Sequence, residues 1–291
     1  MWIGWILASS VFLAFYDLSK KASVRDNAVL PVLLFATIAG AAAYLAALGA
    51  AGGIGAAVCV SAREFALIGV KSLIVSTSWV LTYCALRTLP ITIATPIRAS
   101  APALVFVAAF FLYGERPSLV QGIGMLLVFV GYWAFSWAGK REGIDFLRSR
   151  AVWFALGGMC MSALSSLWDK FILQRCAIPV ERMQFWFQLG LVAVYAVLLG
   201  VQRSVLRKER DCFEWRWSIP ATGVLLAAAD WLYFHGLAIP DVSISVGSLM
   251  RRFSVVITFV LGAIVFHERN LKRKGLALAA ILVGVALLCV R

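Results

Sequence analysis

The chain has 291 residues, of which 62% are hydrophobic and only 14% are charged. A soluble globular domain is about half apolar and about a quarter charged, so this composition excludes an ordinary soluble protein and predicts an integral membrane protein. The net charge of +13 would suggest nucleic acid in a soluble protein. In a membrane protein it indicates basic loops on the cytoplasmic side, and we expect no nucleic-acid partner.

In chain order, ten apolar stretches are each long enough to cross a bilayer, for which about 20 residues are needed. They cover residues 2–22, 28–50, 65–86, 91–113, 117–138, 151–174, 182–202, 217–238, 242–266 and 272–290. The links between them are short, and only 139–150 and 203–216 are substantial loops, neither large enough to form a domain. The sequence therefore predicts an all-α integral membrane protein with ten transmembrane helices.

Lysine and arginine are distributed unevenly over the two sets of loops, which reach opposite sides of the membrane. One set holds Lys20, Lys21, Arg25, Arg87, Lys140, Arg141, Arg148, Arg150, Arg203, Arg207, Lys208, Arg210, Arg216, Arg269, Lys272, Arg273 and Lys274. The other set holds only Arg63, Arg116, Arg175, Arg182 and Arg291. The positive-inside rule predicts that the first set is cytoplasmic and that both termini lie outside. We expect a multi-pass protein of the bacterial inner membrane.

The chain also resembles itself at a shift of about 153 residues. The matched pairs include Arg98 with Arg251, Phe106 with Phe259, Val107 with Val260, Gly131 with Gly284 and, at a shift of 152, Ser10 with Ser162, Asp17 with Asp169 and Trp79 with Trp231. Residues 1–138 and 151–291 then form two units of five spans, joined by a linker over 139–150. Because five is odd, the second unit enters the membrane upside down. Inverted repeats of this kind are common in secondary transporters, which bind substrate near the midplane between the repeats.

Two segments carry a resemblance to a known family. They read "APALVFVAAFFLYGERPSLVQGIGMLLVFVGYWAF" over 101–135 and "SVVITFVLGAIVFHERNLKRKGLALAAILVGVAL" over 254–287. Each has an apolar helix, a Gly-Glu-Arg or His-Glu-Arg corner and a helix with spaced glycines, and together they resemble the two EamA-type repeats of the drug/metabolite transporter superfamily. The resemblance implies two inverted five-helix repeats and transport of a small molecule. Superfamily members move amino acids, nucleotide sugars, phosphorylated sugars, choline and drugs, so the resemblance is weak for the substrate.

Charged residues within the predicted spans are the first candidates for a substrate site, because a charge at the bilayer centre costs at least a few kcal/mol. The basic ones are Lys71, Arg98, Lys170, Arg251 and Arg252, and the acidic ones are Asp17, Asp169 and Asp230. The repeat relation predicts two pairs across the cavity, Asp17 with Arg98 and Asp169 with Arg251. Local alternatives are that Lys20 or Lys21 neutralises Asp17 along the same helix, and that Lys170 beside Asp169 extends toward the headgroups.

The excess of basic over acidic side chains favours an anionic substrate, because buried positive charge needs an anion to offset its desolvation. The planar arginine fork suits a carboxylate or a phosphate. The adjacent Arg251 and Arg252 are similar to a basic pair in sugar-phosphate translocators of the superfamily, which implies phosphate. Aromatic residues near these charges are expected to stack on an organic substrate, although lipid-facing positions are as compatible with the sequence. The predicted site therefore comprises Arg98, Arg251, Arg252, Lys71, Asp17, Asp169, Asp230, Trp79, Tyr83, Trp231 and Tyr233.

Three functions stay open on the sequence. The first is a secondary transporter of a small organic anion, and the second is an exporter of amino acids or cationic compounds that uses the aspartates. The third is a lipid-headgroup translocase or a membrane scaffold that transports nothing. We expect neither an enzyme nor a bound metal or cofactor, because no nucleophile–base set and no metal-ligand spacing occurs. The sequence leaves the oligomeric state open.

Overall fold

The computed structural model describes residues 2–91, 93–94, 97, 101, 104, 118–140, 148–204, 213–239, 251, 253–266 and 271–288. This part of the chain is helical and contains no strand. The helices are α1 (Trp2–Val24), α2 (Val29–Ala50), α3 (Ile54–Val58), α4 (Ala62–Thr88), α7 (Leu119–Lys140), α8 (Arg150–Lys170), the π-helix η1 (Phe171–Arg175), α9 (Val180–Ser204), α10 (Ser218–Ala238), α12 (Phe253–Val265) and α13 (Leu271–Leu288).

Four segments of this part of the chain are long and apolar enough to cross a membrane. They are Val29–Ala50, Ala62–Thr88, Arg150–Arg175 and Val180–Gln202. The shortest has 22 residues and rises about 33 Å, which matches the ~30 Å hydrocarbon core of a bilayer. The span predicted over 91–113 and the first part of the span over 242–266 lie largely outside the described residues. The membrane-protein prediction is therefore confirmed in outline, and the number of ten spans stays a prediction.

The helix ends differ from the predicted ones for local reasons. Helix α4 begins before the predicted span because Ser61 caps it: the Ser61 hydroxyl accepts from the Glu64 backbone N–H, and the Glu64 carboxylate accepts from the Ser61 backbone N–H. This capping box satisfies two donors that the first helical turn leaves free. After α8 the chain continues through the π-helical turn η1, and the short α3 was not predicted at all.

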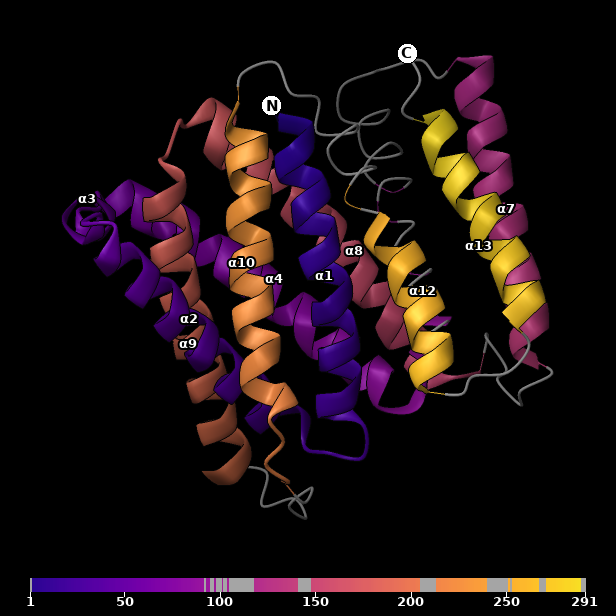
Figure 1. The fold of residues 1–291 in the computed structure, drawn as a ribbon, viewed down its shortest axis with the longest axis horizontal. Coiled ribbons are helices and arrows are strands. Elements are labelled where there is room, and N and C mark those ends of the chain that lie inside the picture. The colour runs from indigo at the N-terminus through magenta and orange to yellow at the C-terminus, as the bar shows by residue number, and fades with distance from the viewer. Residues whose placement is uncertain are drawn as a thin grey trace.

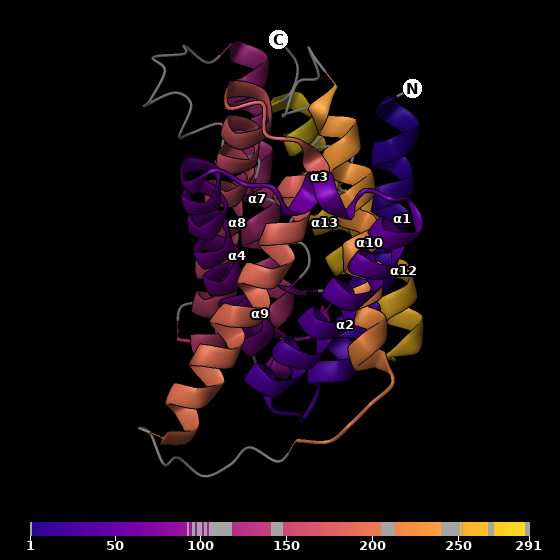
Figure 2. The ribbon, with the colours of Figure 1, turned by 90° about the vertical axis from the view of Figure 1, so that its left-hand side faces the viewer.

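The arrangement of the helices follows a regular pattern. Helices α1 and α10 pack together, as do α4 and α8, α2 and α10, α4 and α9, α2 and α9, and α7 and α13. In Figure 1 the pair α7 and α13 stands at one edge of the molecule, and α2 and α9 stand at the opposite edge. Figure 2 looks onto that second edge, where the short α3 lies against α9. Exchanging α1, α2, α4 and α7 with α8, α9, α10 and α13, respectively, leaves this set of contacts unchanged. Four of the contacts exchange in pairs, and the contacts α2–α9 and α7–α13 map onto themselves.

Glycines make several of the close helix contacts, and two of them lie at matching positions of the two halves. Gly131 on α7 lies against Ile281 on α13, and Gly284 on α13 lies against Val128 on α7. Both pairs are related by the shift of 153 residues. At Gly40 on α2, an added Cβ would lie 2.7 Å from the carbonyl oxygen of Gly223 on α10. Small residues at such contacts let helix backbones approach closely, which is the usual source of helix association in membranes.

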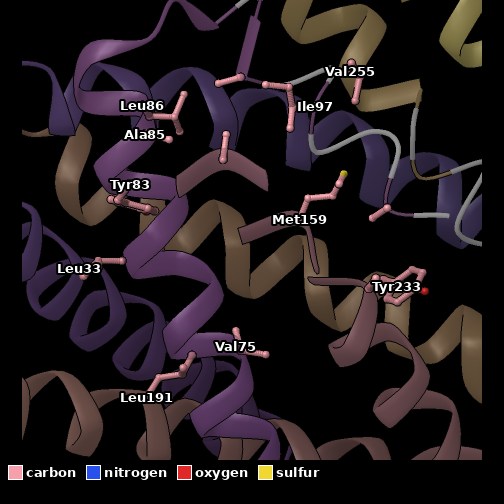
Figure 3. Close-up of a cluster of buried hydrophobic side chains, with 14 of the residues drawn as sticks. Leu33, Val75, Tyr83, Ala85, Leu86, Ile97, Met159, Leu191, Tyr233 and Val255 are labelled. Atoms are coloured by element: carbon pink, nitrogen blue, oxygen red, sulfur yellow. The ribbon is translucent and has the colours of Figure 1, made fainter. Parts of the chain in front are cut away.

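The core of the bundle lies between α1, α2, α4, α8, α9 and α10. Figure 3 shows part of it, with Leu33, Val75, Leu86, Met159 and Leu191 directed into the interior. These side chains are at most 7% exposed. Packing in this core fixes the positions of the polar residues that α4, α8 and α10 carry between the apolar ones.

We expect Gly223→Ala to destabilise the protein, because the new methyl group would collide with the carbonyl oxygen of Ala36. Overpacking of this kind typically costs ~1–3 kcal/mol. Gly69→Ala in α4 is the matched control, since its methyl group would meet no atom within 4 Å. That change should be neutral or stabilise the helix by up to ~1 kcal/mol. Thermal unfolding of both variants measures the difference, and equal melting temperatures would show that the α2–α10 contact is not close.

Candidate functional site

A cavity of about 120 Å³ lies among α1, α4, α8, α9 and α10, with Arg251 in its wall. Six of the predicted site residues line it: Lys71, Trp79, Asp169, Asp230, Tyr233 and Arg251. They come from α4, α8, α10 and the position two residues before α12. The sequence therefore named a set of residues that the fold brings together from distant parts of the chain.

The first feature of the wall is a buried ion pair between α4 and α8. The Lys71 ammonium donates a hydrogen bond to Asp169 Oδ1. Lys71 is 1% exposed and Asp169 is 7% exposed. The Lys71 nitrogen also lies 4.5 Å from the centre of the Phe187 ring and 4.9 Å from that of Phe234. Aromatic faces attract a cation, so two rings and a carboxylate together replace the water that Lys71 loses on burial.

The second feature is an ion pair between α10 and Arg251. The Arg251 guanidinium donates to Asp230 Oδ1 over 2.5 Å. The Cζ atom of Arg251 lies 4.2 Å from the centre of the Tyr233 ring. Asp230 and Tyr233 are three residues apart on α10, so they share one helix face. The buried Nε of Arg251 has no hydrogen-bond partner within the described residues. Arg251 is thus held by an acid and a ring while one of its donors is unused.

The predicted pairing of Asp169 with Arg251 is wrong. Asp169 is bonded to Lys71, and Arg251 is bonded to Asp230. The repeat relation misled the prediction because the position that corresponds to Lys71, at a shift of 152, is Gly223. Only one half of the chain carries this lysine, so its ion pair has no symmetric counterpart.

Asp17 follows the local alternative. Its Oδ1 accepts a hydrogen bond from Lys20 Nζ over 2.9 Å, one helical turn along α1. The Lys20 nitrogen lies 4.5 Å from the centre of the Tyr16 ring and 5.6 Å from that of Tyr83. Asp17 does not line the cavity. The predicted partner Arg98 lies outside the described residues, as does Arg252.

The expected surplus of positive charge is not found in the described part of the cavity wall. That wall contains two cations, Lys71 and Arg251, and two acids, Asp169 and Asp230. Each cation is bonded to one of the acids. The case for an anionic substrate therefore depends on the donor capacity of Arg251 and not on net charge.

The predicted aromatic residues separate into three places. Trp79 and Tyr233 line the cavity, while Tyr83 lines a second cavity of about 10 Å³ that shares Trp79 with the first. Trp231 lies outside both, packed on His235 with ring centres 4.3 Å apart. Trp168 on α8 also lies outside both cavities, and it donates its indole N–H to the carbonyl oxygen of Leu67 over 3.0 Å.

Sequence reasoning missed four serines that line the cavity: Ser78 on α4 and Ser162, Ser165 and Ser166 on α8. The signal was present, because positions 162, 165, 166 and 169 are spaced by three and four residues. Such spacing places side chains on one face of a helix. The serines therefore form a polar row on α8 that ends at Asp169.

The two ends of the bundle are fastened differently. On one side, the Lys21 ammonium of α1 donates to the carbonyl oxygens of Leu86 and Leu89 over 2.6 and 2.7 Å, at the C-terminal end of α4. Near the matching point of the second half, Gln174 donates to the carbonyl oxygen of Leu237 over 3.5 Å. The charged contact is shorter and acts on two carbonyl oxygens.

Metal binding has no ligand set in the described ranges. No three His, Cys, Asp or Glu side chains there come close enough to hold an ion. The cysteines at positions 59, 84, 160 and 176 are free thiols. Among the described residues, the ionic groups of the cavity are therefore the side chains of Lys71, Asp169, Asp230 and Arg251.

A comparison with protein families gives a match in the first half of the chain. Residues 1–137 match the EamA-like transporter family. The match spans 137 of the 291 residues and confirms the resemblance seen in the sequence. The match suggests a membrane transporter of the drug/metabolite type.

The comparison with solved structures supports the fold over nearly the whole chain. A crystal structure titled only "Crystal structure of protein" aligns with a TM-score of 0.67 and 20% identity, covering 97% of this chain and 94% of that one. At this level of identity the likeness concerns the fold alone. No curated protein matches the chain.

Proposed function

We propose that the protein is a secondary transporter that moves a small organic anion, phosphorylated or carboxylated, by alternating access. The main support for this proposal is the position and the hydrogen bonding of the Arg251 guanidinium. Its guanidinium lines the cavity, is positioned by Asp230 and Tyr233, and keeps a buried Nε donor without a partner in the described structure. A buried donor without a partner costs free energy. A substrate carboxylate or phosphate that binds at Arg251 supplies an acceptor for its guanidinium, whose planar fork suits both groups.

Arginine suits this task better than the other cation of the wall. Its planar group offers five N–H donors, so it can bond Asp230 on one side and a substrate oxygen on another. Lys71 is less available, because its ammonium is enclosed by Asp169 and the rings of Phe187 and Phe234. We therefore assign the substrate contact to Arg251 and a supporting role to Lys71.

The pattern of helix contacts supports an inverted repeat, with residues 1–138 and 151–291 as its units. Contacts of Ser9 with Ala229 and of Ser19 with Ser218 show that α1 and α10 run antiparallel. The turn after α1 and the turn after α8 each contain a residue with positive φ, Asp26 at 54° and Ala177 at 51°, at a shift of 151 residues. Two related halves of opposite direction can rock against each other around a central site.

The difference between the two ends supports a state that is closed on one side. The cavity lies beside Asp169, and the corresponding Asp17 is buried with Lys20 and sealed from it. The contacts of Lys21 with Leu86 and Leu89 hold α1 against α4 at that closed end. In the alternate state we expect these contacts to break and the Gln174 contact to tighten.

The size of the cavity limits the substrate. The cavity of about 120 Å³ is large enough to hold several waters or a small solute. A compact metabolite with a single anionic group suits this volume better than a lipid or a large drug.

One alternative has support in the same wall. Asp169 and Asp230 both line the cavity, so a substrate ammonium could bind there if either acid left its partner. An amino acid or a cationic compound would then be carried. This alternative requires breaking an existing ion pair, whereas an anion can bind Arg251 while its pair with Asp230 is kept.

A binding screen on the purified protein tests the proposed charge of the substrate. We expect glycerate or glycerol 3-phosphate to raise the melting temperature, because a ligand that binds only the folded state stabilises it by ~2.7 kcal/mol at 100 times its Kd. The matched cation 3-aminopropane-1,2-diol should give no shift. Stabilisation by the cation and by neither anion would contradict the proposal and favour the aspartates.

A further inference from the structure

We infer that the serine row of α8 forms a hydroxyl-binding side of the cavity, and that the transported anion carries several hydroxyl groups. This inference rests on the proposed function, since it describes the body of the same substrate whose anionic group Arg251 binds. It names the substrate class more narrowly, as a small polyhydroxylated acid or phosphate.

The geometry places the hydroxyls beside the charged groups. Ser162, Ser165 and Ser166 line the cavity one above another on α8, and Asp169 follows them on the same face. Ser78 lines the cavity from α4 and donates to the carbonyl oxygen of Gly158 over 2.8 Å. A substrate held at Arg251 in this cavity of about 120 Å³ would therefore lie within reach of the row.

The hydrogen bonds of these serines show which of them are available. A serine in an apolar helix commonly bonds to the carbonyl oxygen four residues earlier. Ser10, Ser72 and Ser166 do so, over 2.9, 3.0 and 3.1 Å. The structure gives no hydrogen bond to the hydroxyl of Ser162 or Ser165 within the residues that it describes. Two hydroxyls in the wall of a membrane-buried cavity are thus left for water or for a ligand.

The other half of the chain shows that packing does not require these serines. At a shift of 152, Ser162, Ser165 and Ser166 correspond to Ser10, Leu13 and Ala14 on α1. Leu13 lines the same cavity. Two of the three positions are therefore apolar in the matching helix, where the backbone packs in a corresponding way against α10. The cavity has an apolar side on α1 and a hydroxyl side on α8.

Hydroxyl chemistry decides the ligand class. A serine hydroxyl both donates and accepts, as does the hydroxyl of a polyol, so the two form reciprocal hydrogen bonds. A second carboxylate or a methyl group would use only half of this capacity or none. A site built to bond a hydroxyl also discriminates strongly against an analogue that lacks it, because its own polar groups are then left unpaired.

The test compares probes that differ only in hydroxyl groups. Glycerate is paired with 2-methylbutyrate, and glycerol 3-phosphate with 2-methylbutyl phosphate, so that a methyl group replaces each hydroxyl. Isothermal titration on the purified full-length protein should show tighter binding of the hydroxylated member of at least one pair, by about tenfold or more. The two pairs also distinguish a carboxylate from a phosphate as the anionic group.

Variants test whether the serine row causes the tighter binding of the hydroxylated probe. In the double variant Ser162→Ala/Ser165→Ala this preference for the hydroxylated probe should fall to about threefold or less, while the methyl-bearing probe binds as before or more tightly. Each single variant should lose part of it. Ser10→Ala is the matched control, since Ser10 holds the corresponding position on α1 and is bonded to the carbonyl oxygen of Ile6. It should leave the preference unchanged.

Two results would overturn the inference, and they are distinguishable. If wild type binds both members of each pair equally, or if the double variant keeps the preference, the serine row is not a hydroxyl site and the anion proposal stands. If neither pair binds and 3-aminopropane-1,2-diol does, the proposed anion is wrong and the inference fails with it.

Discussion

Replacing Asp169 by Asn is expected to lower the free energy of unfolding by ~3–5 kcal/mol, the usual cost of removing one partner from a buried ion pair. The change leaves the Lys71 ammonium almost fully buried with no carboxylate beside it. The two aromatic rings around Lys71 compensate only in part for the lost carboxylate. A cation over a ring gains ~2 kcal/mol when both are shielded from water. Thermal unfolding in detergent should show a clear decrease in melting temperature.

Two further variants isolate the pair. Glu64→Gln breaks the Arg182–Glu64 ion pair, whose side chains are 23% and 21% exposed, and should cost no more than ~1 kcal/mol. The double variant Lys71→Met/Asp169→Leu removes both charges and should regain much of the lost stability. If Asp169→Asn melts at the wild-type temperature, the Lys71–Asp169 pair contributes little and the link to Lys170 becomes the better explanation.

Replacing Arg251 should have the largest effect on binding. We expect Arg251→Ala to weaken binding of the anion by about 100-fold or more, since a charge-assisted hydrogen bond is worth ~1.5–3 kcal/mol and the loss also leaves Asp230 unpaired. Arg251→Lys keeps the charge and loses the planar fork, so its binding should be intermediate. Titration of each variant with the tighter-binding anion provides the measurement.

Arg182→Ala is the control for this experiment. Arg182 is also a partly buried arginine in an ion pair, but it does not line the cavity. It should bind the anion as wild type does. If Arg251→Ala binds as tightly as Arg182→Ala, the substrate contact lies elsewhere in the site.

The helices and the membrane character could be predicted from the sequence because both depend on local properties. Apolar runs of about 20 residues give spans whatever their neighbours are. The location of Lys71, Asp169, Asp230 and Arg251 in one cavity could also be predicted, since charges inside spans are costly unless they share a protected site.

The partners within that cavity could not be predicted, because a pairing depends on which helices touch. Lys71 meets Asp169 through the packing of α4 against α8. The two halves do not carry the same charges, because the position that corresponds to Lys71 is a glycine. Symmetry between the halves therefore gave the wrong partner for Asp169. The partner of Asp17 lies on its own helix, because Lys20 is one turn away and is the nearest cation in the sequence.

The serine row was missed for a different reason. Serine is common at helix contacts in membranes, so single serines give no functional signal. Only their common face with Asp169, together with Leu13 and Ala14 at the matching positions of α1, separates a ligand-binding role from a packing role. Aligning the two halves position by position would have shown this difference before the structure did.

Uptake into proteoliposomes is the most direct test of the central claim that the protein carries a small anion. Wild type, Arg251→Ala and Arg98→Ala would be compared on radiolabelled glycerate, glycerol 3-phosphate and the matched cation 3-aminopropane-1,2-diol. We predict that wild type takes up an anion and not the cation, and that Arg251→Ala takes up neither. Uptake of the cation by all three proteins, with no uptake of either anion, would contradict the account and move the site to the aspartates.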